Sequence, residues 1–174
     1  MKKPIVSLTS AFFLLVVSYN CHAQFTAKAD KIAIADLSSF TVTGTPVEAT
    51  KINLKAMKNF QNSYPHVTDA QWSVLKDKSQ LCVFQLSEVK YRAFYNPNGS
   101  WSYSVLSYDG KQIKRDLYEK IHATYYDYRI VYVNQIDLSN GKTIYLVEIQ
   151  DDKSIKKIRV SDEDEMDIIS DYAK

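Results

Sequence analysis

The sequence predicts an α+β fold in which one unit, a helix packed on an antiparallel β-meander, is repeated in tandem. The first observation is that apolar residues recur at helical spacing in two separate stretches. The second is that short β-like runs joined by tight turns follow each stretch, unlike the strict β-α-β alternation of a parallel sheet. The composition agrees, because 13 tyrosines with only four glycines and four prolines favour sheet.

Residues 1–23 show the order of features that is typical of a cleavable signal peptide. A short basic start precedes an apolar run at 11–17, and Ala23 supplies a small residue directly before Gln24. The apolar run is too short to span a bilayer, which needs about 20 residues. We therefore expect a mature protein that begins at Gln24, has no membrane span, and resides in the periplasm of a Gram-negative envelope or is secreted.

An alternative interpretation makes Cys21 the lipid-modified first residue of a lipoprotein. Small residues would then be expected just before it, whereas Tyr19 and Asn20 stand there. After removal of the signal peptide Cys82 is the one remaining cysteine, so an intramolecular disulfide is excluded. The neighbours of Cys82 are apolar, which favours a buried, inert thiol over a reactive one in an exposed, cationic setting.

The charge balance argues against a nucleic-acid-binding protein. The chain has 22 basic and 20 acidic residues, and Lys2 and Lys3 belong to the signal peptide, so the remainder is close to neutral. Nucleic-acid binding needs a basic patch. The remaining length of about 150 residues is that of one domain, or of two small units that share a core.

The first repeat is predicted at 46–110, after a weakly patterned N-terminal segment at 24–45 that includes a short strand at 32–34. Its helix is predicted at 47–63, where apolar residues recur at spacings of three and four, and Pro65 ends it. Four strands are expected to follow, at 70–75, 80–86, 89–95 and 101–108, with a strong turn signal at 96–99.

The second repeat is predicted at 111–174, with an acidic C-terminal tail. Its helix carries one apolar stripe, and Tyr125 at the end of that stripe follows Tyr64, at the end of the first helix, by about 60 residues. The stripe consists of Ile113, Leu117, Ile121 and Tyr125, and strands are expected at 129–137, 143–150 and 154–160.

The tail at 161–167 is the densest run of charge. A calcium site is one interpretation, because clustered carboxylates suit that ion, but the run lacks the alternating ligands and central glycine of a calcium loop. The favoured interpretation is a helix start, in which Ser161 caps the helix and acids suit its first turn. Its apolar side would be Ile168, Ile169 and Tyr172.

Two stretches resemble the PepSY-like, or beta-lactamase-inhibitor-like, family of exported domains. In that family a helix ends in an aromatic residue and proline, and a short strand bearing tryptophan follows; here these are Tyr64-Pro65 and Trp72. The family's Ala-x-Tyr-x-x-x-Gly-x-Trp hairpin is matched by Ala93, Tyr95, Gly99 and Trp101. The resemblance covers about residues 50–160, and it is looser in the second repeat, which has no tryptophan.

The resemblance implies tandem units of helix packed on antiparallel sheet, and a binding or inhibitory module rather than an enzyme. It carries over no catalytic residue, and it does not imply that this chain inhibits a beta-lactamase. From the residues themselves, Trp72 is expected in the core, and Asn98 and Gly99 supply the backbone conformation of a turn.

The sequence offers no catalytic, cofactor or metal motif. His66 and His122 fall in different repeats without neighbours at ligand spacing, whereas a metal site needs three or four converging donors. Asp151 and Asp152 are adjacent carboxylates, but they fall in a predicted turn where solvated acids are usual. We therefore expect no enzyme, no cofactor and no metal.

The candidate binding surface is aromatic. A sheet with helices on one face leaves the other face for solvent or a partner, and tyrosine and tryptophan commonly anchor interfaces. Trp101 and Tyr103 share a face by the period of two, and Tyr91 can lie across from them on the preceding strand. These three residues are the predicted anchors for an unknown envelope protein or peptide, unless they pack on the helices as core.

Two other functions stay open at this point. A small-molecule or lipid binder would show an enclosed apolar cavity. A small hydrolase would show a cleft across the two repeats with converging histidine and carboxylates.

Overall fold

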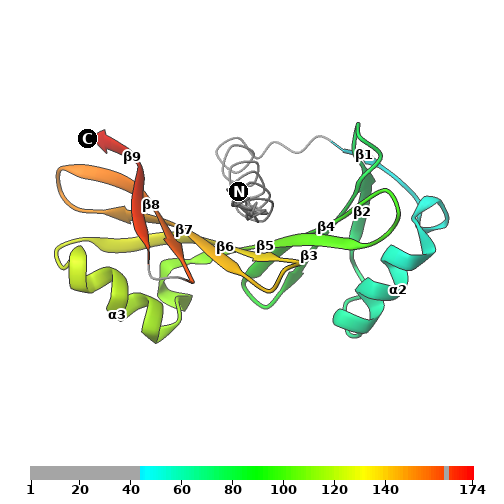
Figure 1. Ribbon diagram of the computed structural model, residues 1–174, viewed down its shortest axis with the longest axis horizontal. Coiled ribbons are helices and arrows are strands. Elements are labelled where there is room, and N and C mark those ends of the chain that lie inside the picture. The colour runs from blue at the N-terminus through cyan, green and yellow to red at the C-terminus, as the bar shows by residue number, and fades with distance from the viewer. Residues whose placement is uncertain (1–43, 163–164) are drawn as a thin grey trace, which may run out of the picture. The chain divides into compact units, whose positions relative to one another are not determined.

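The computed structural model describes residues 44–162 and 165–174 (Figure 1). The predicted signal peptide and the strand predicted at 32–34 lie outside these residues. Within the described residues, nine strands form one sheet in sequential order, and each strand is antiparallel to the next. The strands are β1 Thr45–Pro46, β2 Gln71–Val74, β3 Gln80–Leu86, β4 Val89–Tyr95, β5 Trp101–Asp109, β6 Arg129–Leu138, β7 Thr143–Gln150, β8 Ser154–Ser161 and β9 Met166–Ala173.

Two α-helices interrupt the meander. Helix α2 spans Leu54–Ser63 and helix α3 spans Arg115–Thr124, and each follows a short 3₁₀ turn, η1 Ala49–Lys51 and η2 Gly110–Gln112. Both α-helices end on a tyrosine whose backbone N–H still donates to the carbonyl four residues earlier, Tyr64 to Phe60 and Tyr125 to Ile121. The predicted end of the first helix, at or just before Tyr64, is therefore correct, and the apolar stripe of the second helix ends at the tyrosine that caps it.

The first helix begins later than the spacing of its apolar residues predicts. The side chain of Asn53 accepts a hydrogen bond of 2.9 Å from the backbone N–H of Lys55, so Asn53 is the N-cap. Val47 instead donates its backbone N–H to the carbonyl of Trp72, beside the short strand β1. The start predicted at Val47 is wrong because this segment pairs with the sheet.

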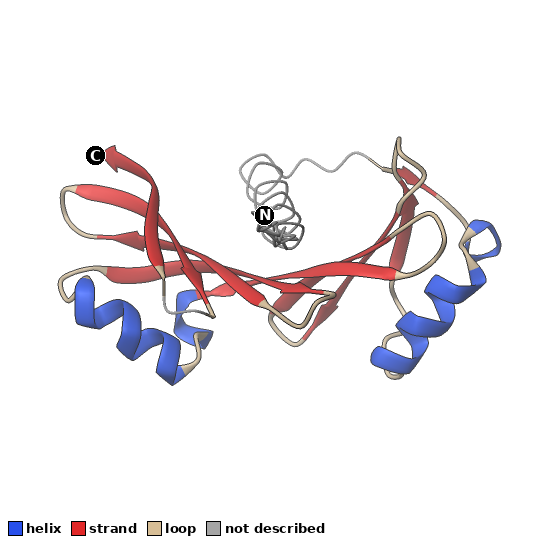
Figure 2. Cartoon of the chain, viewed as in Figure 1, coloured by secondary structure: helices blue, strands red, loops and turns tan. Residues whose placement is uncertain are grey.

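Both helices pack on the same face of the sheet (Figure 2). Ala93 on β4 belongs to the buried cluster of α2, and it pairs with Ser104 on β5, so the two side chains share a face. Tyr108 lies four residues further along β5, on the same face, and belongs to the buried cluster of α3. No helix of the described residues lies on the opposite face.

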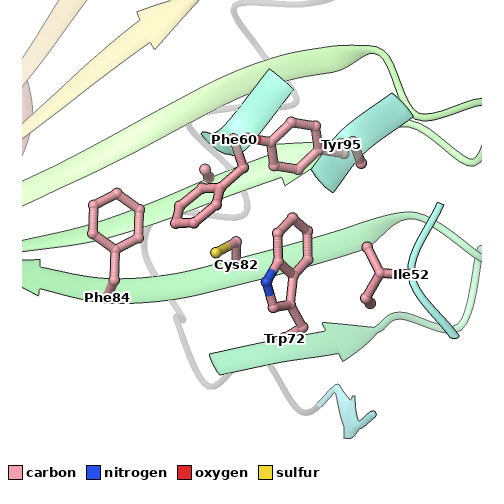
Figure 3. Close-up of a cluster of buried hydrophobic side chains, with 8 residues drawn as sticks. Ile52, Phe60, Trp72, Cys82, Phe84 and Tyr95 are labelled. Carbon is pink, nitrogen blue, oxygen red and sulfur yellow. The ribbon is translucent and has the colours of Figure 1, made fainter. Parts of the chain in front are cut away.

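Two buried clusters hold the helices in place. In the first, the Phe60 ring meets those of Trp72 and Phe84 edge-on, at 5.5 Å and 5.3 Å between centroids (Figure 3). This confirms the predicted core positions of Trp72 and Cys82, which are 9% and 0% exposed. The buried members are Ile52, Ala56, Phe60, Trp72, Cys82, Phe84, Ala93 and Tyr95 in the first cluster, and Tyr108, Leu117, Ile121, Val133, Val147, Ile149, Ile158 and Val160 in the second.

Met166–Ala173 form the strand β9, so the helix predicted to start at Ser161 with Ile168, Ile169 and Tyr172 on its apolar side is wrong. β9 pairs with β8 along its length, and two of its acids form ion pairs with bases of β8. Arg159 contacts Asp167 at 2.5 Å, and Lys156 contacts Asp171. The complementary charge of the neighbouring strand, together with β-branched residues in the tail, outweighs the capping signal at the start of the run.

Candidate functional site

The three predicted anchors do not share one face of the sheet. Phe94 pairs with Tyr103, but Tyr95 pairs with Trp101, so Ser102 is an extra residue on β5. Such a β-bulge reverses the alternation of side chains. Trp101 therefore faces the helices and Tyr103 faces the opposite side, and the prediction that they share a face is wrong.

Trp101 and Tyr91 both lie on the helix side. Trp101 is half-buried against the first cluster, and its Nε1 donates to Oγ of Ser104 at 2.9 Å. Tyr91 stacks on Phe84 at 4.9 Å with only 12° between the rings. Tyr91 pairs across the strands with Leu106 rather than with Trp101. These two anchors are thus integrated in the packing of α2, the alternative that the sequence left open.

Tyr103 lies on the face opposite the helices. Its ring stacks on Phe94, with 4.4 Å between the centroids and 15° between the planes. A polar row runs along the same face: Nη2 of Arg92 donates to Oγ of Ser107 at 2.8 Å, and that hydroxyl donates to Oδ1 of Asn134 at 2.7 Å. Burial lowers the pKa of Arg92.

A cavity of about 240 Å³ lies on the helix side, between the C-terminal turn of α2 and the centre of the sheet. We call it the Asp137 cavity, after the one charged residue in its lining. The Tyr64 side chain is hydrogen-bonded to Ser104, the residue that also accepts from Trp101. The lining residues are Asn59, Ser63, Tyr64, Tyr95, Trp101, Ser104 and Asp137.

Asp137 is held in place by its neighbours on β6 and β7. Its Oδ1 accepts from Nε2 of Gln135 at 2.9 Å and from Oγ1 of Thr143 at 3.1 Å. The negative charge of Asp137 contributes to a raised pKa of tyrosines on the same face of the sheet. Burial, and secondarily Asp137, raise the pKa of Tyr91, and burial, Tyr145 and Asp137 raise the pKa of Tyr108 to about 12.

Sequence reasoning missed Asp137. The residue comes near the end of a strand, next to a hairpin turn, where a solvated acid is the ordinary expectation. Its cavity partners Tyr64 and Trp101 are distant in the chain, and only the sheet register brings them together. No local motif could have identified this site, although the excess of tyrosine was visible.

The two histidines lie apart from this cavity. His66 is exposed, and His122 packs its ring on Tyr118 at 4.3 Å in a groove at the end of α3 that also includes Asp109 and Asp127. In the part of the chain that the structure describes, no hydrogen bond joins His122 to a carboxylate. Nor do three or more histidine, cysteine or acidic side chains of these residues come together as a metal would require.

Asp151 and Asp162 both accept hydrogen bonds from the backbone. Asp151 accepts hydrogen bonds from the backbone N–H groups of Lys153 and Ser154, at 2.9 Å and 2.6 Å, inside the β7–β8 turn. In the acidic tail, Asp162 accepts from the backbone N–H of Thr143. Residues 163–164, the middle of the candidate calcium site, lie outside the described residues.

Among the described residues, none of the helices has the length and apolar character needed to cross a membrane.

No protein-family model and no curated protein matches this chain. Solved structures from Bacteroides are similar in fold. A DUF2874 family protein from Bacteroides ovatus aligns with a TM-score of 0.54 and 11% identity, over 69% of this chain and 86% of its own. A protein described as periplasmic, from Bacteroides eggerthii, has a TM-score of 0.52 and 13% identity, over 69% and 87% of the two chains.

A third similar structure is a BLIP-like protein from Bacteroides fragilis, with a TM-score of 0.51 and 10% identity over 68% of this chain and 84% of its own. At these identities the comparison shows the fold alone. In its described residues the chain thus has a BLIP-like fold of mostly antiparallel sheet with two α-helices.

Proposed function

We propose that this chain is an exported binding module that recognises a protein or peptide in the periplasm or outside the cell. Its fold is similar to those of a periplasmic protein and a BLIP-like protein. The features at 1–23, with a basic start and a short apolar run, support export. We expect no enzymatic activity and no cofactor.

The observation that carries this proposal is the composition of the face opposite the helices. The stacked rings of Phe94 and Tyr103 lie next to a polar row that includes Arg92 and Ser107. Protein interfaces commonly combine an aromatic centre with arginine and a hydrogen-bonding surround. Phe94 and Ser107 are buried, whereas Tyr103 and Arg92 are half-buried and are the groups of this face that a partner would contact.

The same proposal includes a tandem repeat of a helix on a meander. Tyr64 and Tyr125 end their helices with similar backbone angles, φ −136° and ψ 63° against φ −119° and ψ 61°. Each carbonyl then accepts from the residue three positions on, Val67 and Tyr128, at 3.2 Å in both cases. Four strands follow each helix, which extends the binding face across both repeats.

The test is a comparison of partner capture by two tyrosine variants. Protein isolated from the envelope fraction and carrying Tyr103→Ala should lose the partner that the unmodified protein retains. Tyr126→Ala is the matched control, because this tyrosine is 81% exposed beside α3 and away from the proposed face. Equal capture by the Tyr103→Ala variant and the unmodified protein would exclude this face as the binding surface.

A further inference from the structure

The Asp137 cavity brings together three segments that are distant in sequence. The last turn of α2 contributes Tyr64, β5 contributes Trp101 and Ser104, and β6 contributes Asp137. The cavity lies on the helix side of the sheet, whereas the proposed partner surface is on the opposite face. A ligand in this cavity would therefore bind independently of the proposed partner surface.

The lining combines aromatic rings with a single negative charge. Tyr64, Tyr95 and Trp101 supply three rings, and among the described residues no lysine or arginine is part of the lining. Within the described residues, no base forms an ion pair with Asp137, and the two hydrogen bonds that it accepts both go to Oδ1. Its Oδ2 accepts no hydrogen bond from any of these residues.

Two of the rings, those of Trp101 and Tyr64, are hydrogen-bonded to Ser104 at their polar ends. Ser104 accepts from Nε1 of Trp101 and is hydrogen-bonded to Tyr64. The one charge in the lining is thus a carboxylate whose Oδ2 has no hydrogen-bond donor among the described residues, an arrangement that disfavours an anion and favours a cation. A lone carboxylate without further acidic, histidine or cysteine ligands is a poor metal site.

We propose that the Asp137 cavity binds an organic ammonium group, such as the end of a lysine side chain or a small alkylamine. An ammonium ion gains from a carboxylate at close range and from the faces of tyrosine and tryptophan rings. The volume of about 240 Å³ is below the range of about 300–1,000 Å³ that is usual for drug-sized ligands, so it suits one side chain or a small amine.

Three probes test whether binding depends on the charge of the ammonium group or only on the shape of the ligand. They also test whether the ligand is a protein side chain or a free amine. The first is Nα-acetyl-lysine methylamide, the second is the same compound with its side-chain amine acetylated, and the third is pentylammonium. Binding is followed at pH 7 by intrinsic fluorescence, because Trp101 lines the cavity and the chain has only one other tryptophan, Trp72.

We expect a saturable change with the lysine compound and at least tenfold weaker binding of its neutral, acetylated form. Pentylammonium that binds as well as the lysine compound points to a free amine as the ligand. Binding of the lysine compound alone points to a side chain of a partner protein. Equal binding of the neutral and charged lysine compounds, or no saturable binding of either ammonium probe, overturns the proposal.

Asp137→Asn is the decisive variant, because asparagine retains an oxygen that can accept from Gln135 and Thr143 while the charge is lost. We expect it to weaken binding of the ammonium probe at least tenfold, with an unchanged melting profile. Asp152→Asn, an exposed acid in the β7–β8 turn, is the matched control and should bind as the unmodified protein does. Equal affinity of the Asp137→Asn variant overturns the proposal.

Discussion

Gly99 lies directly against the side chain of Asn53, the residue that caps helix α2. A Cβ placed on Gly99 would be 2.4 Å from Oδ1 of Asn53. Nδ2 of Asn53 also donates to the carbonyl of Pro97 at 3.3 Å. The β4–β5 turn is therefore docked on the N-terminus of the helix, and Gly99 is buried there although residues 96–98 of the same turn are exposed.

The first prediction is that Gly99→Ala destabilises the domain strongly. Gly99 has φ of +79°, which costs an alanine about 1–2 kcal/mol, and its Cβ would also clash with the Asn53 amide. We expect a loss of about 3 kcal/mol in the free energy of unfolding, measured by urea denaturation.

The control for this prediction is Gly141→Ala. Gly141 has almost the same φ, +83°, but no atom lies within 4 Å of the position that its Cβ would take. This variant should lose only the backbone part, about 1–2 kcal/mol. Equal losses of unfolding free energy in the two variants would show that the close packing of Gly99 against Asn53 does not add to the cost of the substitution.

The turn illustrates what sequence patterns can and cannot provide. The pair Asn98 and Gly99 correctly predicted a tight turn, because the positive φ that the turn requires is a local property of glycine. The contact with Asn53 joins residues that are far apart in the chain, so it has no local signature. The helix ends at Tyr64 and Tyr125 were likewise predictable from a proline or from the end of an apolar stripe.

The second prediction separates the roles of Trp101 and Tyr103. Trp101→Ala removes a half-buried ring and its hydrogen bond to Ser104, so we expect a loss of stability of about 2–3 kcal/mol, below the 3–5 kcal/mol of a fully buried tryptophan. Tyr103→Ala should mainly weaken partner binding, by about 2 kcal/mol or roughly 30-fold.

Melting curves and partner affinity, measured on both variants, check this assignment. A Trp101→Ala variant that melts like the unmodified protein but fails to bind its partner would contradict it, and would return Trp101 to the binding surface. Trp101 and Tyr103 were assigned to one face because alternation with a period of two was assumed throughout β5. The extra residue at Ser102 depends on pairing with β4, and no single-strand pattern reveals it.

The acidic tail shows a second limit of pattern analysis. A serine followed by acids is a sound helix-start signal for an isolated segment. Here the edge of β8 offers Lys156 and Arg159 as partners for Asp171 and Asp167, and the tail becomes a strand. The identity of the neighbouring strand decides the structure, and the tail's own sequence does not contain that information.

The third prediction concerns export and the N-terminus of the mature protein. Because the basic start, apolar run and small residue before Gln24 occur in export order, we expect cleavage between Ala23 and Gln24. Intact-mass analysis of protein from the envelope fraction measures this directly. A mass that retains residues 1–23, or a lipid attached to Cys21, would contradict the prediction.

The fourth prediction is that Cys82 reacts with alkylating reagents only when the protein unfolds. Its side chain is fully buried under helix α2, and burial raises the pKa of the thiol from 9.0 to about 12. Iodoacetamide at pH 8 should therefore label Cys82 in denaturant and leave it unmodified in the native protein, as measured by peptide mass spectrometry. Rapid labelling of the native protein would mean that α2 opens readily.

The fifth prediction is that the domain loses stability in alkaline solution. Burial raises the pKa of Cys82 and of Tyr108 in the folded state to about 12, from ordinary values of 9.0 and 10.0. The unfolded chain releases these protons above about pH 9 while the folded chain keeps them, so deprotonation favours unfolding. Stability from these groups is fully present below pH 9 and is lost as the pH rises towards 12.

Urea denaturation at several pH values tests the alkaline effect, and Cys82→Ala is the variant that isolates one contribution. At pH 10, one unit above the ordinary thiol pKa, the unfolded state gains about 1.4 kcal/mol from Cys82 alone. The variant should start from a lower stability at pH 7, because it loses a buried sulfur. Its stability should then fall less steeply between pH 8 and pH 10 than that of the unmodified protein. Identical pH slopes would show that the Cys82 thiol does not titrate differently in the folded and unfolded states.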